Sequence, residues 1–230
     1  MDNFRGLLTG IVLLLFNSNL VSQTTLDYKD RIHPVVSDKF MVVSQNYHAT
    51  EVGYEILEKG GNAVDAAVAM GFALAVTLPR AGNLGGGGFM LLFDAETKNV
   101  STIDYRSAAP ASAKSSMYLT EDGVIKYGHL VNAVPGTVAG LIKAHQDHGK
   151  MNLKQVMMPA IRLAHKGIPV SNDLNFILNW AKESLFKNKA SKAKFYKDEE
   201  PLEINSVFRQ PRLAKTVTLI SQKGHEAFYK

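Results

Sequence analysis

The densest run of apolar residues lies between Asn62 and Leu78, with the sequence NAVDAAVAMGFALAVTL. Asn62 is a residue type that caps helix N-termini, and Asp65 in the first turn suits the positive end of the helix dipole. The pattern therefore predicts a helix over Asn62–Leu78 with no polar face, which is either buried between layers or inserted in a membrane. A membrane-spanning helix needs roughly 17–25 apolar residues. Because this run is short for a span and contains Asp65, the buried helix is favoured.

A glycine run, Gly85–Gly88, leads from this helix into a predicted β-hairpin of Gly88–Asp94 with Val100–Tyr105. A short polar turn separates the two strands, as is usual in hairpins. The apolar run Phe89–Phe93 predicts a buried strand lying over the helix. Phosphate-binding loops run from strand to glycines to helix, whereas here the glycines follow a helix and precede a strand. The glycines therefore predict close backbone packing and not a nucleotide site.

Elsewhere the apolar spacing is mostly helical, with glycines after several of the periodic segments. The first candidate element is a short strand at residues 40–44, and residues 187–200 are charged and expected to be exposed. The predicted helices cover residues 50–59, 136–148, 153–166, 171–185 and 213–223. Helices that alternate with a few paired strands indicate an α+β or layered α/β class.

The N-terminus has the pattern of an export signal. Arg5 precedes the apolar run 7–16, which has the length of a signal-peptide core, although an uncleaved N-terminal anchor is the alternative. We expect residues 1–22 to be a signal peptide (or N-terminal anchor), residues 23–38 a linker and residues 39–230 the folded body. The body of the protein is then exported, to the periplasm or the extracellular space.

Composition narrows the possible chemistry. The chain has 46% hydrophobic and 20% charged residues, as globular proteins do, and a net charge of +5. It contains no cysteine, which excludes thiol nucleophiles, disulfides and thiolate zinc sites. The lysines between Lys182 and Lys197 could contact nucleic acid, but in an exported protein a solvated surface is the better interpretation.

Two motifs have the spacing of a functional site without its full set of residues. His145 and His148 could share a helix face as metal ligands, but no second cluster completes a site, so a solvated helix end is favoured. Gly136 and Gly140 have the spacing of a nucleophile elbow, but Val138 occupies the serine position. Close helix packing is the better interpretation of that motif.

Arg106 is the strongest candidate for binding chemistry. It follows the second hairpin strand, at the start of a segment rich in alanine, serine and proline. A guanidinium in that position can hold a carboxylate through two parallel hydrogen bonds. A structural salt bridge is the alternative.

Five segments together resemble the γ-glutamyltransferase family, in the same order and spacing. They are GGNAVDAAVA (60–69), GNLGGGGFMLLFDA (82–95), DYRSAAP (104–110), VPGTVAG (134–140) and PAIRLAHKGIPVS (159–171). The resemblance runs from about Phe40 to Lys230 and covers the N-terminal part of that family's large subunit, so the chain looks truncated. It implies part of an N-terminal-nucleophile hydrolase fold with a layered αββα arrangement, incomplete in this chain.

The resemblance also implies a function. In the family, a precursor cleaves itself, and the N-terminal threonine of the small subunit attacks the γ-glutamyl amide of glutathione and related compounds. Water or an amino-acid or peptide acceptor then takes the γ-glutamyl group. The implied partners are the small subunit of the same precursor and these substrates, with no nucleic acid, and no metal or organic cofactor is implied.

Arg106 matches the family arginine that holds the glutamyl α-carboxylate, although Ser107 stands where the family often has glutamate. No catalytic residue is assigned, because the nucleophilic threonine would lie beyond this chain, and we expect these 230 residues alone to be inactive. One alternative is a β-lactam glutaryl acylase of the same architecture. The other is a non-catalytic fragment that only binds a partner.

Overall fold

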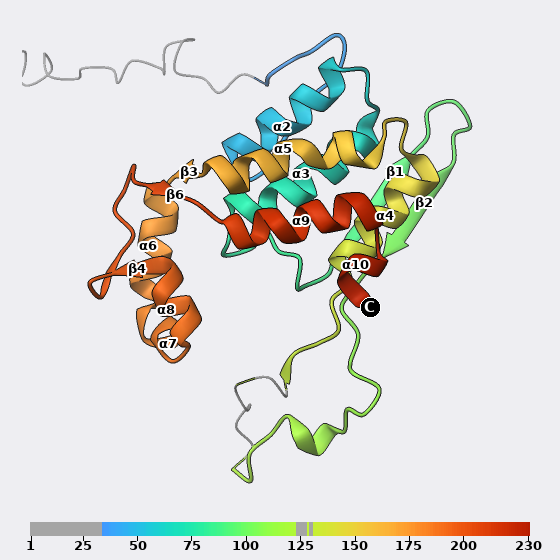
Figure 1. Ribbon diagram of the computed structural model, residues 1–230. Helices are drawn as coiled ribbons and strands as arrows, with labels where there is room; N and C mark the ends of the chain where they lie inside the picture. The colour runs from blue at the N-terminus through green and yellow to red at the C-terminus, as the bar shows by residue number, and fades with distance from the viewer. Residues whose placement is uncertain (1–33, 123–127, 129–130) are drawn as a thin grey trace, which may run out of the picture. The chain divides into compact units, whose positions relative to one another are not determined.

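The computed structural model describes residues 34–122, 128 and 131–230 (Figure 1). The predicted signal peptide or anchor at 1–22, and the predicted linker as far as residue 33, lie outside the described residues. Residues Phe40–Lys230 form one compact unit, which is distinct from Met1–Lys39.

The predicted apolar helix is the central helix α3 (Ala63–Thr77). The Asn62 side chain accepts a hydrogen bond from the Asp65 N–H while the Asp65 carboxylate accepts one from the Asn62 N–H, so each residue caps the other. Side chains such as Phe72 and Val68 are fully buried, and the prediction of a buried helix is confirmed. Within the described ranges no helix combines the length and apolarity that crossing a bilayer requires.

Several helices pack against α3 and against one another. α3 packs against α2, α5 and α4, while α9 packs against α5 and α10 against α9 (Figure 1). The predicted helices are confirmed, although α2 and α9 begin a few residues earlier than expected. Their bounds are α2 (Tyr47–Glu58), α4 (Thr137–His148), α5 (Leu153–Lys166), α9 (Pro211–Lys223) and α10 (Glu226–Tyr229), and a 3-10 turn η3 (Ser115–Met117) precedes α4.

A second apolar cluster gathers the residues after α5. The predicted helix 171–185 is interrupted at Ala181, and the charged segment 187–200 contains a helix that the pattern did not predict. Lys182 and Lys192 in this region form ion pairs with Glu200 (3.4 Å) and Glu199 (2.6 Å). The elements are β3 (Ile168–Pro169), α6 (Asn172–Trp180), α7 (Lys182–Phe186), α8 (Lys189–Phe195), β4 (Tyr196–Lys197), β5 (Glu200–Pro201) and β6 (Val207–Phe208), with β3 paired to β6 and β4 to β5.

The predicted hairpin is confirmed as β1 (Phe89–Phe93) and β2 (Val100–Asp104), an antiparallel pair. Its burial differs from the prediction. Met90, Leu92 and Ile103 pack against the core, but Phe89, Leu91 and Phe93 are 65%, 74% and 59% exposed. The strand is therefore buried only on the face that packs against the helical core. No described segment covers its other face.

The predicted strand at residues 40–44 is wrong. Exposed and half-buried residues alternate along it, as in a strand, but no described segment pairs with it. Ser44 instead donates its backbone N–H to the Thr50 hydroxyl of α2. Residues 40–44 are therefore an extended segment and not a β-strand, since a strand requires a hydrogen-bonded neighbour.

Asp65 ties the connection between α4 and α5 to the start of α3. Its carboxylate is fully buried and accepts N–H groups from Asn62 (2.9 Å), Lys150 (3.1 Å) and Met151 (3.2 Å). His145 Nε2 lies 3.7 Å from Asp65 Oδ1, with only 11% of its side chain exposed. The prediction that His145 sits at a solvated helix end is therefore wrong, because the histidine packs inward against this carboxylate.

Asp65→Ala is expected to lower the free energy of unfolding by about 2–4 kcal/mol, because three N–H groups that point at this fully buried carboxylate lose their acceptor. Asp147→Ala is the matched control, since Asp147 pairs only with Lys143 on an exposed helix surface and should cost about 0.5 kcal/mol or less. Denaturant unfolding of the protein that carries this chain measures both. Equal losses in the two variants would contradict the role assigned to Asp65.

Candidate functional site

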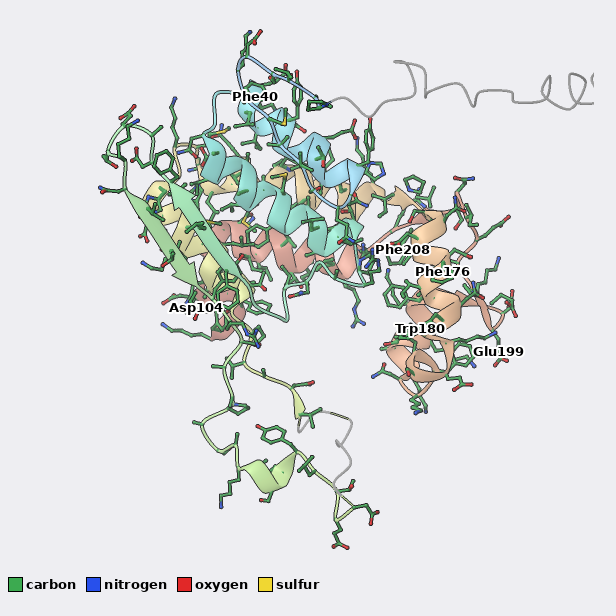
Figure 2. All side chains as sticks on the ribbon, turned by 180° about the vertical axis from the view of Figure 1, so that it is seen from behind. Phe40, Asp104, Phe176, Trp180, Glu199 and Phe208 are labelled. Atoms are coloured by element: carbon green, nitrogen blue, oxygen red, sulfur yellow. The ribbon has the colours of Figure 1, made fainter. Side chains whose placement is uncertain are left out.

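Arg106 lies just beyond β2, on the outer face of the hairpin. Side chains alternate between faces along a strand, which places Arg106 on the same face as Asp104 and Thr102. Its guanidinium carbon Cζ lies 5.9 Å from the centroid of the Phe89 ring, in cation–π geometry. Figure 2 labels Asp104 at the end of the hairpin, where the chain continues into the segment that carries Arg106.

The backbone around Arg106 is fixed on both sides. Tyr105 and Gly88 exchange hydrogen bonds of 3.0 and 3.3 Å, which extend the hairpin ladder by one pair. Two residues further on, Ala108 and Val134 form an antiparallel bridge with hydrogen bonds of 3.0 and 2.8 Å. The Arg106 N–H itself donates to Asp104 Oδ1 at 2.9 Å. The long Arg106 side chain therefore starts from a well-defined backbone position.

Two glycines make this arrangement possible. A Cβ atom at Gly87 would lie 2.5 Å from both the Tyr105 carbonyl oxygen and the Ser107 nitrogen, and one at Gly136 would overlap the Tyr105 carbonyl oxygen. The carbonyl oxygen of Gly86 accepts the N–H groups of Gly136 (2.7 Å) and Thr137 (3.0 Å), which joins the glycine run to the start of α4. The predicted close backbone packing of the glycine run is confirmed.

Helix α4 also lies close to Tyr105, at the positions of its glycines. Cβ atoms at Gly140 and at Gly88 would both collide with the Tyr105 side chain, so the phenol ring occupies the space that the missing side chains leave. Burial there raises the pKa of Tyr105 above its ordinary value. The close packing predicted for the Gly136–Gly140 motif is also confirmed.

Asn83 belongs to the same cluster but was not singled out in the sequence. Its Oδ1 atom accepts the Gly86 N–H (2.6 Å) and the Thr137 hydroxyl (3.2 Å), so one amide oxygen bridges the glycine run and α4. A lone asparagine next to glycines is a common turn residue, and nothing in the local pattern indicates the contact with Thr137, which lies far along the chain.

The guanidinium of Arg106 is exposed, and no carboxylate of the described residues lies within ion-pair distance of it. The structural salt bridge considered as an alternative is therefore absent from the described part of the chain. An unpaired guanidinium beside an aromatic ring suits a planar carboxylate ligand, which it can bind through two N–H groups. Over the described ranges, histidines and acidic residues form no cluster of three or more that could hold a metal ion.

Comparison with known proteins identifies close relatives of this chain. A family model described as "Gamma-glutamyltranspeptidase" matches residues 49–230. A glutathione hydrolase proenzyme of Escherichia coli K12 is 44% identical over 88% of this chain and 36% of its own length. The corresponding proenzyme of Bacillus subtilis 168 is 42% identical over 83% of this chain and 33% of its own. The chain therefore spans about one third of the length of these relatives.

Solved structures show the same fold. The γ-glutamyltranspeptidase of Helicobacter pylori superposes with a TM-score of 0.81 at 38% identity, covering 86% of this chain and 58% of that one. A γ-glutamyltranspeptidase of Pseudomonas nitroreducens gives 0.76 at 40% identity, covering 85% and 58%. A cephalosporin acylase of Bacillus halodurans gives 0.72 at 25% identity, covering 86% and 40%. The α+β class and the N-terminal-nucleophile hydrolase fold are thereby confirmed.

Gly136→Ala is expected to lower the free energy of unfolding by about 1–3 kcal/mol, because the added methyl group forces the Tyr105 carbonyl away from α4. Gly85→Ala is the matched control, since a Cβ atom there meets nothing within 4 Å, and it should stay within about 0.5 kcal/mol of the parent. Thermal or denaturant unfolding measures both variants. A Gly136→Ala protein as stable as Gly85→Ala would show that the backbone contact is not tight.

Proposed function

The chain belongs to the γ-glutamyltranspeptidase family, and we propose that it forms part of an enzyme that hydrolyses or transfers the γ-glutamyl group of glutathione and related compounds. Two relatives with more than 40% identity are named glutathione hydrolase proenzymes, and the fold is that of solved γ-glutamyltranspeptidases. The chain spans only about one third of those relatives. The complete activity therefore includes groups outside these 230 residues.

The observation that carries the proposal is the guanidinium of Arg106, which has no carboxylate partner among the described residues and extends from a fixed backbone. In this role Arg106 binds the α-carboxylate of the γ-glutamyl group through two charge-assisted hydrogen bonds. The Phe89 ring beneath it, at 5.9 Å, limits where the guanidinium can lie. The bound carboxylate then holds the γ-amide at a set distance from Arg106, and orientation of this kind lowers the barrier of the following step.

The nucleophile in this proposal is a threonine of the precursor's small subunit, as the resemblance implies. Its hydroxyl attacks the γ-carbonyl carbon, the amide C–N bond breaks, and the leaving amine takes up a proton. Water or an acceptor amine then releases the γ-glutamyl group. Arg106 binds the donor in both steps but takes part in no bond exchange, so these residues alone would bind a carboxylate without cleaving the amide.

We further propose that the small subunit covers the outer face of the hairpin. Phe89, Leu91, Phe93 and Val100 form this face, and each is more than half exposed. An exposed apolar surface on a sheet indicates an interface, and the proenzyme names of the relatives suggest a precursor that is processed into two subunits. A partner here would lie next to Arg106, at the end of the same face.

Export is also part of the proposal. The apolar N-terminal segment has the composition of a secretory signal, so the enzyme would act on γ-glutamyl compounds in the periplasm or outside the cell. Residues 1–22 would then be the signal peptide (or N-terminal anchor), residues 23–38 a linker, and residues 39–230 the large-subunit portion.

An acylase acting on glutaryl β-lactams is the second candidate, because a cephalosporin acylase shares the fold. Its identity to this chain is 25%, against 44% for a glutathione hydrolase proenzyme. A glutaryl group has a terminal carboxylate but no α-amine, so both substrates could use Arg106. Rates with γ-glutamyl and glutaryl anilides distinguish the two functions, and we expect the γ-glutamyl substrate to react faster.

Arg106→Ala in the complete enzyme is expected to lower kcat/KM for a γ-glutamyl anilide roughly tenfold or more, through a higher KM, because the carboxylate loses a bidentate contact. Arg106→Lys should recover part of the loss, since it keeps the charge but not the planar fork. Arg162→Ala is the control, because Arg162 pairs with Glu55 on another surface. Unchanged kinetics in Arg106→Ala would remove Arg106 from the substrate site.

Leu91→Asp is expected to reduce the yield of processed two-subunit enzyme several-fold, because a charge in the centre of the hairpin's outer face would be desolvated by the partner. Thr97→Asp, in the hairpin turn, is the matched control. Gel analysis of the precursor and its products measures processing, and an apolar dye reports exposed surface. Normal processing in Leu91→Asp would show that the small subunit does not cover this face.

A further inference from the structure

Tyr229 connects the short helix α10 to the start of α4, although the two lie about ninety residues apart in sequence. Its hydroxyl donates to the Pro135 carbonyl oxygen at 2.8 Å and accepts the Ala139 N–H at 3.2 Å. The residue at the N-cap of α4 is Gly136, which has no side chain to cap the helix. The phenolic oxygen of Tyr229 therefore does for Ala139 what a capping serine or asparagine would do.

The segment held by Tyr229 also holds the backbone of Arg106. Val134, directly before Pro135, forms the two-way bridge with Ala108. Gly136, directly after Pro135, packs against the Tyr105 carbonyl with no room for a side chain. Residues on both sides of Pro135 thus contact residues on both sides of Arg106, and Tyr229 fixes Pro135 between them.

The position of the Tyr229 hydroxyl is itself well determined. The ring is half-buried against the main apolar core. It stacks on His225 with the ring centroids 4.5 Å apart, and it meets Phe228 edge-on at 5.0 Å. With the ring held in this way, the two hydrogen bonds at its tip constrain the position of α4 relative to α10.

We propose that Tyr229 is a positioning residue for Arg106, and this rests on the proposed role of Arg106 in binding the donor carboxylate. Tyr229 touches neither substrate nor Arg106. It fixes residues 134–137, and through them the backbone from which the Arg106 side chain reaches its ligand. Loss of the hydroxyl frees that backbone to shift, which weakens donor binding and leaves the later chemical steps unaffected.

The test compares two tyrosine variants of the complete enzyme. Tyr229→Phe removes only the hydroxyl. Tyr196→Phe is the matched control, because it removes a hydroxyl that donates to the Leu178 carbonyl oxygen at 2.5 Å in the second apolar cluster, which follows α5. Both variants should lose some thermal stability. Only Tyr229→Phe should raise KM for the γ-glutamyl donor, by about two- to tenfold because both hydrogen bonds of the hydroxyl are lost, with kcat unchanged.

A double-mutant cycle separates positioning from general stabilisation. In the Arg106→Ala background, Tyr229→Phe should raise the donor KM no further, because the group that it positions is gone. Equal effects of Tyr229→Phe in the presence and absence of Arg106, or an unchanged KM in the single variant, would overturn the inference while leaving the proposed function intact. An Arg106→Ala enzyme with unchanged KM would remove Arg106 from the donor site, and the inference with it.

Discussion

The end of the β1–β2 hairpin, where Arg106 follows, depends on direct contact between backbones with no side chain between them. At Gly87 and Gly136 there is no space for a Cβ atom, because the carbonyl of Tyr105 lies against both positions. The end of β2 is therefore enclosed between the glycine run and the start of α4. Backbone groups are less mobile than side chains, so the arginine that follows starts from a fixed point. Because this backbone is already ordered, ligand binding costs conformational entropy only for the Arg106 side chain and not for the chain that carries it.

The charge arrangement complements this rigidity. Several charged groups on the helices form ion pairs, such as Arg162 with Glu55 and Arg80 with Asp173. Asp65, the fully buried carboxylate, is satisfied by backbone N–H groups. Arg106 has no such partner among the described residues and lies beside an apolar face. Such a guanidinium can bind a carboxylate that a ligand supplies, and in the proposed function that ligand is a γ-glutamyl compound.

Local sequence predicted the elements whose ends are marked by specific residues. Asn62 and Asp65 define the start of α3, and Gly149, Gly167 and Gly224 follow the ends of α4, α5 and α9. The strand at residues 40–44 and the burial of β1 were predicted wrongly, since both depend on neighbours that periodicity does not specify. The place of Arg106 after the second hairpin strand singled it out as a candidate, and its match to a family motif supplied the expected ligand. The contacts of Asn83 and Tyr229 join segments far apart in sequence, so no local pattern indicates them.

The one-sided hairpin has a consequence for biosynthesis. Its strands are complete by residue 104, and its inner face packs on helices that follow within the same chain. No described segment covers the outer face, and the two relatives are about two and a half times as long as this chain. In the proposed enzyme the small subunit covers this face, so the precursor exposes an apolar surface until that segment folds onto it, and an intermediate with such a surface is prone to aggregate. Folding of the proposed precursor then competes with self-association, and chaperones that shield apolar strands would favour folding.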